Sequence, residues 1–286
     1  MQGKNGKIGL ILGGGAMRGM YTAGVLDVFL DREIEVDGVI GISAGAVFGV
    51  NLLSRQRGRV IRYNKRFNSD KNYMGIGPLL RTGNIVNTEY AYRVVPRELD
   101  KFDDETYRAS GVPFYAGVTS LETGRAEYIR IDSVFEQMDA LRASASMPFV
   151  SRPVAWKGQH YLDGDIADSI PYQTMFDMGY DRLIVVLTRE RGYQKKPISP
   201  AMIRLYYGKY REFASALMRR HEKYNSGAKE LEALERQGKV LLIAPSEPIT
   251  IGRVEKDPEK LQQVYELGIR DGVEAVDRLR ELCGSL

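Results

Sequence analysis

One serine of this chain stands in a setting that suits a nucleophile. Ser43 lies in GVIGISAGAVFGV (residues 38–50), between a strand-like apolar run and a helix-like one. Gly41 and Gly45 flank it in the pattern G-x-S-x-G. In a sharp strand-to-helix turn this pattern exposes the serine hydroxyl, and larger side chains in place of the glycines would collide. The pattern predicts a nucleophile; the alternative is a tight structural turn with a buried serine.

A second glycine-rich stretch, LGGGAMRG (residues 12–19), follows another apolar run. Such a loop presents backbone N–H groups that can hold an anion. A dinucleotide site is disfavoured because G-x-G-x-x-G fails in both registers: Arg18 or Ala16 stands where glycine is needed. An oxyanion hole is the better interpretation, because loops after adjacent parallel strands lie together and N–H donors stabilise a tetrahedral intermediate.

The serine needs a base, and the sequence offers few. Only two histidines occur, His160 and His221. His221 lies in a charged stretch and is expected at the surface, whereas His160 is expected in a strand on the face opposite to Asp163. Asp163 begins DGDIADSIP, where a strand is expected to end, and its carboxylate could accept the serine proton directly. The alternative for Asp163 is an ordinary turn aspartate.

The elements that must hold these residues follow an α/β pattern. Strand, glycine loop, helix, strand and helix alternate over residues 7–53, which indicates a parallel sheet with right-handed crossovers. A hairpin is expected near 114–130, two short strands joined at Lys157–Gly158, and further strands at 181–188 and 239–245. Residues 55–100 predict a short helix and then irregular structure, as in a lid or rim. We expect a single domain over residues 1–286.

Composition excludes several functions. The 286 residues carry a net charge of +4 and a single cysteine, Cys283, so no internal disulfide can form and a reducing compartment fits. Metal and cofactor are not expected, and the acidic run DGDIAD lacks the glycine position and final glutamate of a calcium loop. Neither a signal peptide nor a membrane span is apparent, and no nucleic-acid motif accompanies the charge. We therefore expect a cytoplasmic protein that at most touches a membrane from its surface.

Four motifs in order carry a resemblance to a known family. GGGAMRG, GISAG, RASASMPFV and YLDGD, with a proline following, span residues 13 to about 171 and together resemble a patatin-like phospholipase. The resemblance implies a three-layer α/β/α hydrolase with a mainly parallel central sheet and a Ser-Asp dyad. By position Ser43 matches the family nucleophile, Asp163 the dyad acid, the Gly14–Gly15 loop with Ala16 the oxyanion hole, and Arg18 its basic residue. The part from about 190 onward, expected to be mostly helical, matches less specifically.

Two residues depart from the family pattern. Ala16 stands where glycine is usual, but an alanine still donates its N–H. Asp165 stands where the dyad motif usually has glycine or alanine. A second carboxylate could raise the pKa of Asp163; the interpretation we prefer from sequence is that Asp165 points to solvent.

The resemblance implies hydrolysis of carboxylic esters, with lipid acyl esters as the substrate class and an acyl-enzyme on Ser43. The alternative is a lipid- or protein-binding module that kept the fold without activity. One helix over residues 200–221 mixes tyrosines with basic residues, which suits an anionic bilayer surface, although an ordinary amphipathic helix with a solvated basic face is the interpretation we prefer. Arg55, Arg57, Arg59 and Arg62 could likewise meet phosphate head groups or form only a charged helix end. No feature indicates an oligomeric state.

Overall fold

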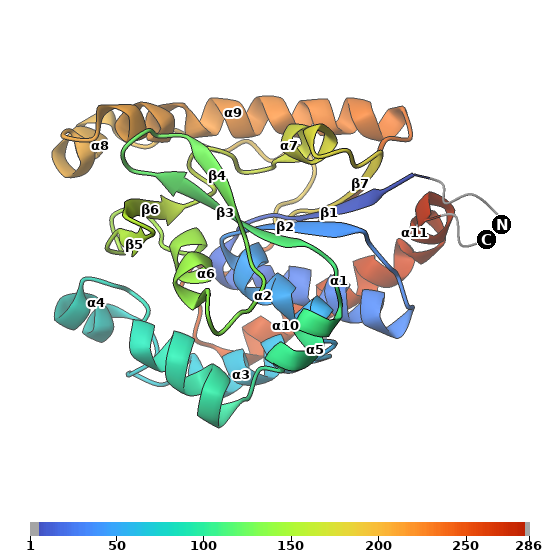
Figure 1. Ribbon diagram of the computed structural model, residues 1–286, viewed down its shortest axis with the longest axis horizontal. Helices are drawn as coiled ribbons and strands as arrows, with labels where there is room; N and C mark the ends of the chain where they lie inside the picture. The colour runs from blue at the N-terminus through green and yellow to red at the C-terminus, as the bar shows by residue number, and fades with distance from the viewer. Residues whose placement is uncertain (1–5, 284–286) are drawn as a thin grey trace.

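A central mixed sheet with helices on both faces makes up the computed structural model of the protein, which describes residues 6–283 (Figure 1). The strands are β1 (Ile8–Leu12), β2 (Gly38–Ile42), β3 (Phe114–Ser120), β4 (Ala126–Arg130), β5 (Val154–Trp156), β6 (Gln159–Asp163), β7 (Arg182–Val186) and β8 (Val240–Ile243). The strands β3, β2, β1, β7 and β8 are parallel to their neighbours in that order, and β4, β5 and β6 join antiparallel beside β3. The expected α/β fold with a mainly parallel sheet is confirmed.

Helices cover both faces of this sheet. They are α1 (Met20–Asp31), α2 (Ala44–Leu53), α3 (Arg59–Phe67), α4 (Ile76–Thr82), α5 (Asp104–Ala109), α6 (Met138–Ser144), α7 (Tyr172–Asp177), α8 (Pro200–Tyr207), α9 (Arg211–Arg236), α10 (Pro258–Glu274) and α11 (Val276–Cys283), with a 3₁₀ turn over Ala16–Gly19 and a π-helix over Tyr90–Leu99. In Figure 1, α1, α2 and α10 lie below the sheet, and α7 and α9 lie above it.

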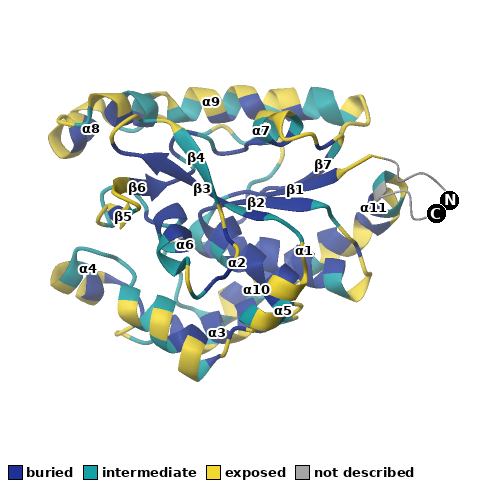
Figure 2. Ribbon diagram, in the orientation of Figure 1, coloured by how far each residue is buried: buried dark blue, intermediate teal, exposed yellow. Residues whose placement is uncertain are grey.

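Burial explains why the central strands read as unbroken apolar runs. Every residue of β1 and β2 is buried, because a helical layer covers each face of the sheet. Figure 2 shows the same division, with buried residues along the strands and exposed residues on the outer faces of the helices. The two largest parts of the core therefore lie on opposite faces, one between the sheet and α1, α2 and α10, the other between the sheet and α7 and α9.

The register of β6 determines where the site forms. Strand β2 pairs with the first part of β3 and ends at Ile42, opposite Gly117. The next residue of β3, Val118, pairs with Asp163, the last residue of β6. Because β4 occupies the other edge of β3 over the same residues, β2 and β6 share one edge and meet end to end. The residue after β2, Ser43, thereby comes next to Asp163.

Residues 55–100 are more regular than the sequence predicts. They form α3, α4 and the π-helix instead of one helix and an irregular stretch. A single antiparallel bridge, Met74 to Val86, links the chain on either side of α4. The weak periodicity of the segment comes from α4 and the π-helix, which bury only one and two residues, whereas α3 buries six of its nine.

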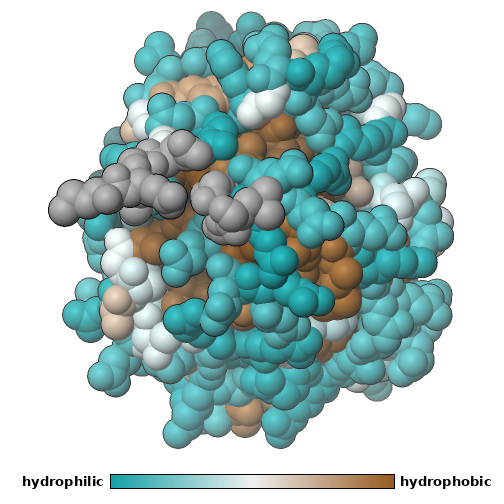
Figure 3. Space-filling model, turned by 90° about the vertical axis from the view of Figure 1, so that its right-hand side faces the viewer, coloured by the Kyte–Doolittle hydropathy of each residue, from teal (hydrophilic) through white to brown (hydrophobic). Residues whose placement is uncertain are grey.

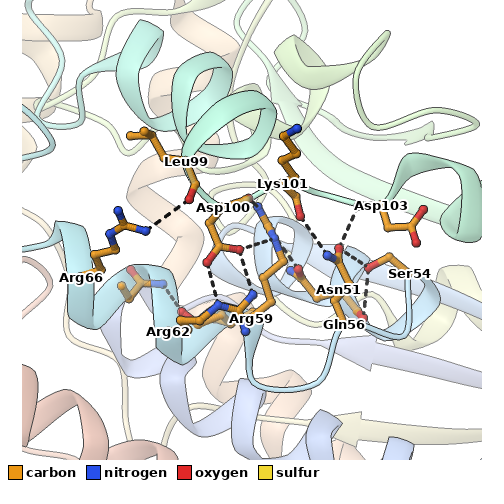
Figure 4. A network of polar contacts seen from close by, with 12 residues as sticks. Asn51, Ser54, Gln56, Arg59, Arg62, Arg66, Leu99, Asp100, Lys101 and Asp103 are labelled. Atoms are coloured by element: carbon orange, nitrogen blue, oxygen red, sulfur yellow. Dashed lines mark hydrogen bonds and ion pairs between the residues drawn. The ribbon is translucent and has the colours of Figure 1, made fainter.

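An ion-pair network around the buried Arg59 and Asp100 joins the two ends of residues 55–100 (Figure 4). Arg59 and Arg62, both on α3, contact the carboxylate of Asp100 with N–O distances of 3.1 and 2.8 Å. Gln56 donates its side-chain amide to the carbonyl oxygen of Lys101 at 2.9 Å. The beginning and the end of the 55–100 segment are thus tied to each other, and the residues between them form a fixed wall.

The sequence left open whether the arginines of residues 55–62 meet head groups or form only a charged helix end. Arg57, Arg59 and Arg62 form ion pairs with Asp31 or Asp100, although the side chains of Arg57 and Arg62 are more than half exposed. The helix expected over 200–221 is two helices, since α8 ends at Tyr207 and α9 begins at Arg211.

The helix predicted to end the chain is likewise divided into α10 and α11. Asp257 caps α10 before Pro258 as expected, and its side chain accepts the backbone N–H of Glu259 at 2.9 Å.

No helix within residues 6–283 is long and apolar enough to cross a membrane. Figure 3 shows the end of the molecule where the termini lie, on which hydrophilic residues predominate and apolar ones appear between them.

Replacing Asp100 with alanine should destabilise the fold strongly. Arg59 and Asp100 have side chains only 5% and 6% exposed, so the variant leaves a buried guanidinium without its counter-ion. Breaking one partner of such a pair costs about 3–5 kcal/mol of unfolding free energy. Urea denaturation measures this loss. The control is Asp132→Ala, which breaks the exposed pair with Arg130 and should change stability by about 0.5 kcal/mol or less. Equal losses in the two variants would contradict the role of the network.

Candidate active site

The backbone turns sharply at Ser43, between β2 and α2. Its dihedral angles are φ 56° and ψ −122°, a sparsely populated region that costs a non-glycine residue on the order of 1–3 kcal/mol. The Ser43 N–H donates to Ser144 Oγ at 3.0 Å, and Ser144 Oγ donates to the carbonyl oxygen of Gly117 at 2.7 Å. These bonds hold the turn from a neighbouring helix and strand.

The two glycines of G-x-S-x-G are needed for steric reasons that the structure makes explicit. A β-carbon at Gly41 would lie 2.5 Å from the Cα of Ala46 in the first turn of α2. A β-carbon at Gly45 would collide with the carbonyl oxygen of Leu12 at the end of β1. The pattern therefore packs α2 tightly against the ends of β1 and β2.

The glycine loop after β1 lies against this turn, as the sequence predicts. A β-carbon at Gly14 would come within 2.9 Å of the Ser43 Cβ. Gly14 also accepts a hydrogen bond from Thr188 Oγ1 at 2.6 Å through its carbonyl oxygen. Within residues 6–283, the backbone N–H groups of Gly14, Gly15 and Ala16 have no hydrogen-bond acceptor. Ala16 adopts a left-handed conformation, φ 49°, which is compatible with alanine at some cost.

The Ser43 hydroxyl donates to the Asp163 carboxylate, with an Oγ–Oδ2 distance of 2.7 Å between two buried side chains. The other carboxylate oxygen, Oδ1, accepts the backbone N–H of Asp165 at 2.9 Å. The main chain of Asp163 is held as well, by Ser146 O at 2.9 Å and Thr119 Oγ1 at 2.8 Å. Asp163 is therefore fixed in orientation toward the serine.

Burial raises the pKa of Asp163 to about 7, and the nearby charge of Asp165 adds to this rise. Hydrogen bonds from the Asp165 N–H and from Ser43 oppose it only in part. A carboxylate with a pKa near neutrality takes up and returns protons most readily near that pH. This pair can accordingly exchange a proton.

Asp165 does not point to solvent, so the preferred sequence interpretation was wrong. Its carboxylate forms ion pairs with Lys195, at 2.6 Å, and with Arg220. Burial alone would raise the pKa of Asp165, but these two cations hold it well below its usual range. The sequence also allowed a second carboxylate to raise the pKa of Asp163. This alternative applies, because the charged Asp165 carboxylate raises the pKa of Asp163.

Neither histidine of the sequence contacts Ser43. His160 is half-exposed on β6, with Nδ1 3.0 Å from a Glu122 carboxylate oxygen. His221 is less exposed than expected, and its Nδ1 lies 3.0 Å from Met218 O. Both positions follow from the strand and helix faces on which the histidines stand.

Two cavities of opposite character meet at Ser43 and Ala16. One, of about 120 Å³, is lined mostly by apolar side chains from α2, α3, α6 and the 55–100 wall. The other, of about 360 Å³, is more polar and carries the charged groups, since its lining includes Gly14, Gly15, Arg18, Asp163 and Asp165. All the residues predicted to take part in the reaction thus face one polar pocket, while Gly41 and Gly45 support it from behind.

Several residues at the site were not identified from the sequence. Ser144 lies within RASAS, but nothing in that stretch indicates that its hydroxyl accepts the backbone N–H of Ser43. Lys195 and Arg220 come from the later part of the chain, and Arg220 was expected on a solvated basic face or at a membrane surface. The unusual acid at position 165 was the one available signal, because a buried carboxylate requires a cationic partner.

Fold and site together define an α/β protein with a serine elbow, an adjacent N–H loop and a buried carboxylate. The chain belongs to the patatin-like phospholipase family, whose model matches residues 10–176. A second family model, described as a domain of unknown function (DUF6363), matches residues 210–284. Membership of the first family supports lipid acyl hydrolysis in general.

Curated relatives cover the same part of the chain. It is 28% identical over 187 residues to the uncharacterised protein YjjU of Escherichia coli, covering 64% of this chain and 52% of that protein. It is 29% identical over 185 residues to the lysophospholipase nte1 of Emericella nidulans, covering 63% of this chain and 12% of nte1. This chain therefore spans about half of the first relative and a small part of the second. The crystal structure of VipD from Legionella pneumophila aligns with a TM-score of 0.46 and 14% identity, over 96% of this chain and 67% of VipD.

Proposed function

We propose that the protein is a serine acyl hydrolase that cleaves carboxylic esters of lipids, with Ser43 as nucleophile and Asp163 as base. The observation that carries the proposal is the 2.7 Å hydrogen bond from Ser43 Oγ to a buried Asp163 carboxylate whose pKa is raised to about 7. A direct serine–carboxylate pair needs no histidine, which agrees with the positions of both histidines away from the serine.

The reaction would proceed through an acyl-enzyme. Asp163 accepts the Ser43 proton while Oγ bonds to the ester carbonyl carbon; the carbon–oxygen bond to the alcohol then breaks, and that oxygen takes the proton from Asp163. In the second half Asp163 accepts a proton from water, the water oxygen bonds to the acyl carbon, and Ser43 leaves and recovers the proton. The sum is ester and water giving acid and alcohol.

The developing negative charge on the carbonyl oxygen needs donors beside Ser43. The N–H groups of Gly14, Gly15 and Ala16 lack acceptors within the described chain and line the pocket at the serine. Each such donor is worth a few kcal/mol in the transition state. Arg18, on the same loop, adds positive charge to the pocket. We assign this loop as the oxyanion hole.

The apolar cavity suits the acyl chain. Its walls, which include Phe48, Val95, Leu141 and Met147, begin at Ser43 and Ala16, where the ester carbonyl would lie. One of the relatives carries the name lysophospholipase, which agrees with a lipid acyl ester as the substrate. Residues 55–100 would then act as a rim around the acyl chain. Because Lys195 and Arg220 reach Asp165, we propose that residues 1–286 work as one domain.

Substitution at Ser43 or Asp163 tests the proposal. Ser43→Ala should abolish both fluorophosphonate labelling and turnover of a short p-nitrophenyl ester, because the attacking atom is gone. Asp163→Asn should lower kcat by roughly 10²–10⁴-fold, the usual contribution of a general base. His160→Gln and His221→Gln serve as matched controls and should retain wild-type rates. Full labelling of folded Ser43→Ala would contradict the assignment of Ser43 as nucleophile. Lipid binding without any ester turnover by the wild type would favour a binding module.

The pH profile should report Asp163. The base must be ionised, so kcat/KM should fall as the pH decreases through about 7. Asp165→Asn removes a negative charge and leaves Lys195 and Arg220 in place, so it lowers the pKa of Asp163 and shifts the acidic limb to lower pH. Asp177→Asn, which removes an exposed carboxylate at the end of α7, should leave the acidic limb where it is. If the acidic limb of the pH profile shifts by the same amount in Asp165→Asn and Asp177→Asn, or shifts in neither variant, the assignment of Asp163 as the base would be contradicted.

We also propose peripheral contact with an anionic bilayer. Ile76 and Leu80 of α4 and Leu205 of α8 are 74%, 82% and 80% exposed, and the exposed arginines Arg81 and Arg204 stand beside them. Both helices lie at the end of the molecule that carries β5 and β6, away from the termini (Figure 1). Exposed apolar side chains among basic ones suit the interface of an anionic membrane.

Charge at these positions should weaken membrane binding. The double variant Leu80→Glu/Leu205→Glu should bind phosphatidylglycerol vesicles at least roughly tenfold less well, because each buried leucine contributes about 1.5–3 kcal/mol. Vesicle sedimentation measures the change. The control is Met178→Glu/Val273→Glu, which alters two exposed apolar residues outside α4 and α8. Equal binding by the two double variants would argue against this surface.

A further inference from the structure

The polar pocket beside Ser43 carries more positive charge than the reaction needs. Its lining includes six basic side chains and two carboxylates, Asp163 and Asp165. The basic residues are Arg18, Arg189, Lys195, Lys196, Arg220 and Arg253. Asp163 faces the serine and Asp165 is occupied by Lys195 and Arg220. The remaining cations of the lining are therefore not neutralised within the pocket.

Three of these cations come from different loops and have no carboxylate partner within residues 6–283. Arg18 Nε is buried without any hydrogen-bond partner there. Arg189 makes one long bond, 3.5 Å, to the carbonyl oxygen of Ile249, and Arg253 makes no ion pair in the same part of the chain. Burial, together with the nearby charges of Arg189 and Arg253, lowers the pKa of Arg18 to about 10. Mutual repulsion of this kind is relieved by an anion.

The same pocket is poorly suited to a cationic head group. Both of its tyrosines already carry a cation: the Arg189 guanidinium lies 4.5 Å from the Tyr193 ring centroid, and Lys195 Nζ lies 4.2 Å from that of Tyr224. Recognition of a quaternary ammonium relies on aromatic faces or carboxylates. Of these groups in the lining, both tyrosines and both carboxylates are engaged, and Phe149 is the remaining aromatic ring.

We propose that Arg18, Arg189 and Arg253 form a subsite for the phosphate of the leaving group, so that the enzyme selects acyl esters of glycerol phosphate with a terminal phosphomonoester over zwitterionic phosphocholine esters. This inference rests on the proposed hydrolysis at Ser43. Arg189 and Arg253 lie outside the residues 10–176 that match the patatin-like family model, so the selectivity belongs to the later part of this chain.

The charge of the ligand explains the selectivity. A phosphomonoester carries about −1.5 to −2 at pH 7, together with three strong acceptor oxygens. Guanidinium groups bind such oxygens through paired hydrogen bonds, and a choline beyond the phosphate would add a positive charge to a pocket that is already positive. With the acyl chain in the apolar cavity, the glycerol would span the junction at Ser43.

The test compares three substrates that share one short acyl chain, all kept below their micellar concentrations so that membrane partitioning plays no part. They are the acyl glycerol phosphate, the acyl glycerophosphocholine and the uncharged monoacylglycerol. For the wild type, kcat/KM for the phosphomonoester should exceed that for the phosphocholine ester by roughly tenfold to a hundredfold, the usual effect of hydrogen bonds to charged groups. The double variant Arg189→Gln/Arg253→Gln should bring this ratio down to about one, because two of the three guanidiniums are lost.

A matched control removes the same amount of charge elsewhere. Arg211→Gln/Arg236→Gln changes two exposed arginines of α9 that do not line the pocket, and it should keep the wild-type ratio. A second measurement does not depend on turnover: glycerol 3-phosphate should bind Ser43→Ala in calorimetry, and the affinity should drop when Arg189→Gln/Arg253→Gln is added.

The outcomes separate this inference from the proposed function. Absence of hydrolysis of all three substrates would overturn the function, while binding of glycerol 3-phosphate would still support an anion subsite. Hydrolysis with equal rates for the phosphomonoester and the phosphocholine ester would overturn the subsite alone. Binding of inorganic phosphate or glycerol 3-phosphate without any substrate preference would indicate a site for free phosphate and would also contradict the inference.

Discussion

The hydrogen bond between Ser43 Oγ and Asp163 Oδ2 is the contact on which the rest of the site depends. It exists because β2 and β6 pair with the same edge of β3 in opposite directions. The C-terminal end of β2 therefore meets the C-terminal end of β6, at Ile42 and Asp163. A shift of β6 by one residue would turn Asp163 to the other face of the sheet. The strained turn at Ser43 is held by Ser144 and by the close packing of Gly45, so the serine has one orientation toward the carboxylate.

Electrostatics gives the two neighbouring aspartates different states. Asp165 is ionised because Lys195 and Arg220 lie against it, and its charge together with burial brings the pKa of Asp163 close to neutrality. The cations come from the part of the chain after β7, beyond the segment that matches the patatin-like family model. The later part of the chain thereby sets the chemical state of a carboxylate that belongs to the earlier part.

Much of this arrangement follows from the sequence. The order of apolar runs and glycine loops predicts the parallel sheet, and the spacing of Gly41, Ser43 and Gly45 predicts the elbow, because both depend on neighbours close in the chain. The state of Asp165 does not follow, since its partners stand 30 and 55 residues away and no local pattern marks them. Of the 55–100 wall only one short helix was predicted; α4 and the π-helix were missed because they bury only one and two residues, which leaves little apolar periodicity to detect.

The most direct test of this account is a high-resolution structure of the protein after reaction with a short-chain alkyl fluorophosphonate. The account predicts a covalent bond from Ser43 Oγ to phosphorus, the phosphonyl oxygen on the N–H groups of the Gly14–Gly15 loop, and the alkyl chain in the apolar cavity lined by α2. An adduct on another residue, or a Ser43 adduct whose phosphonyl oxygen faces away from the glycine loop, would contradict it.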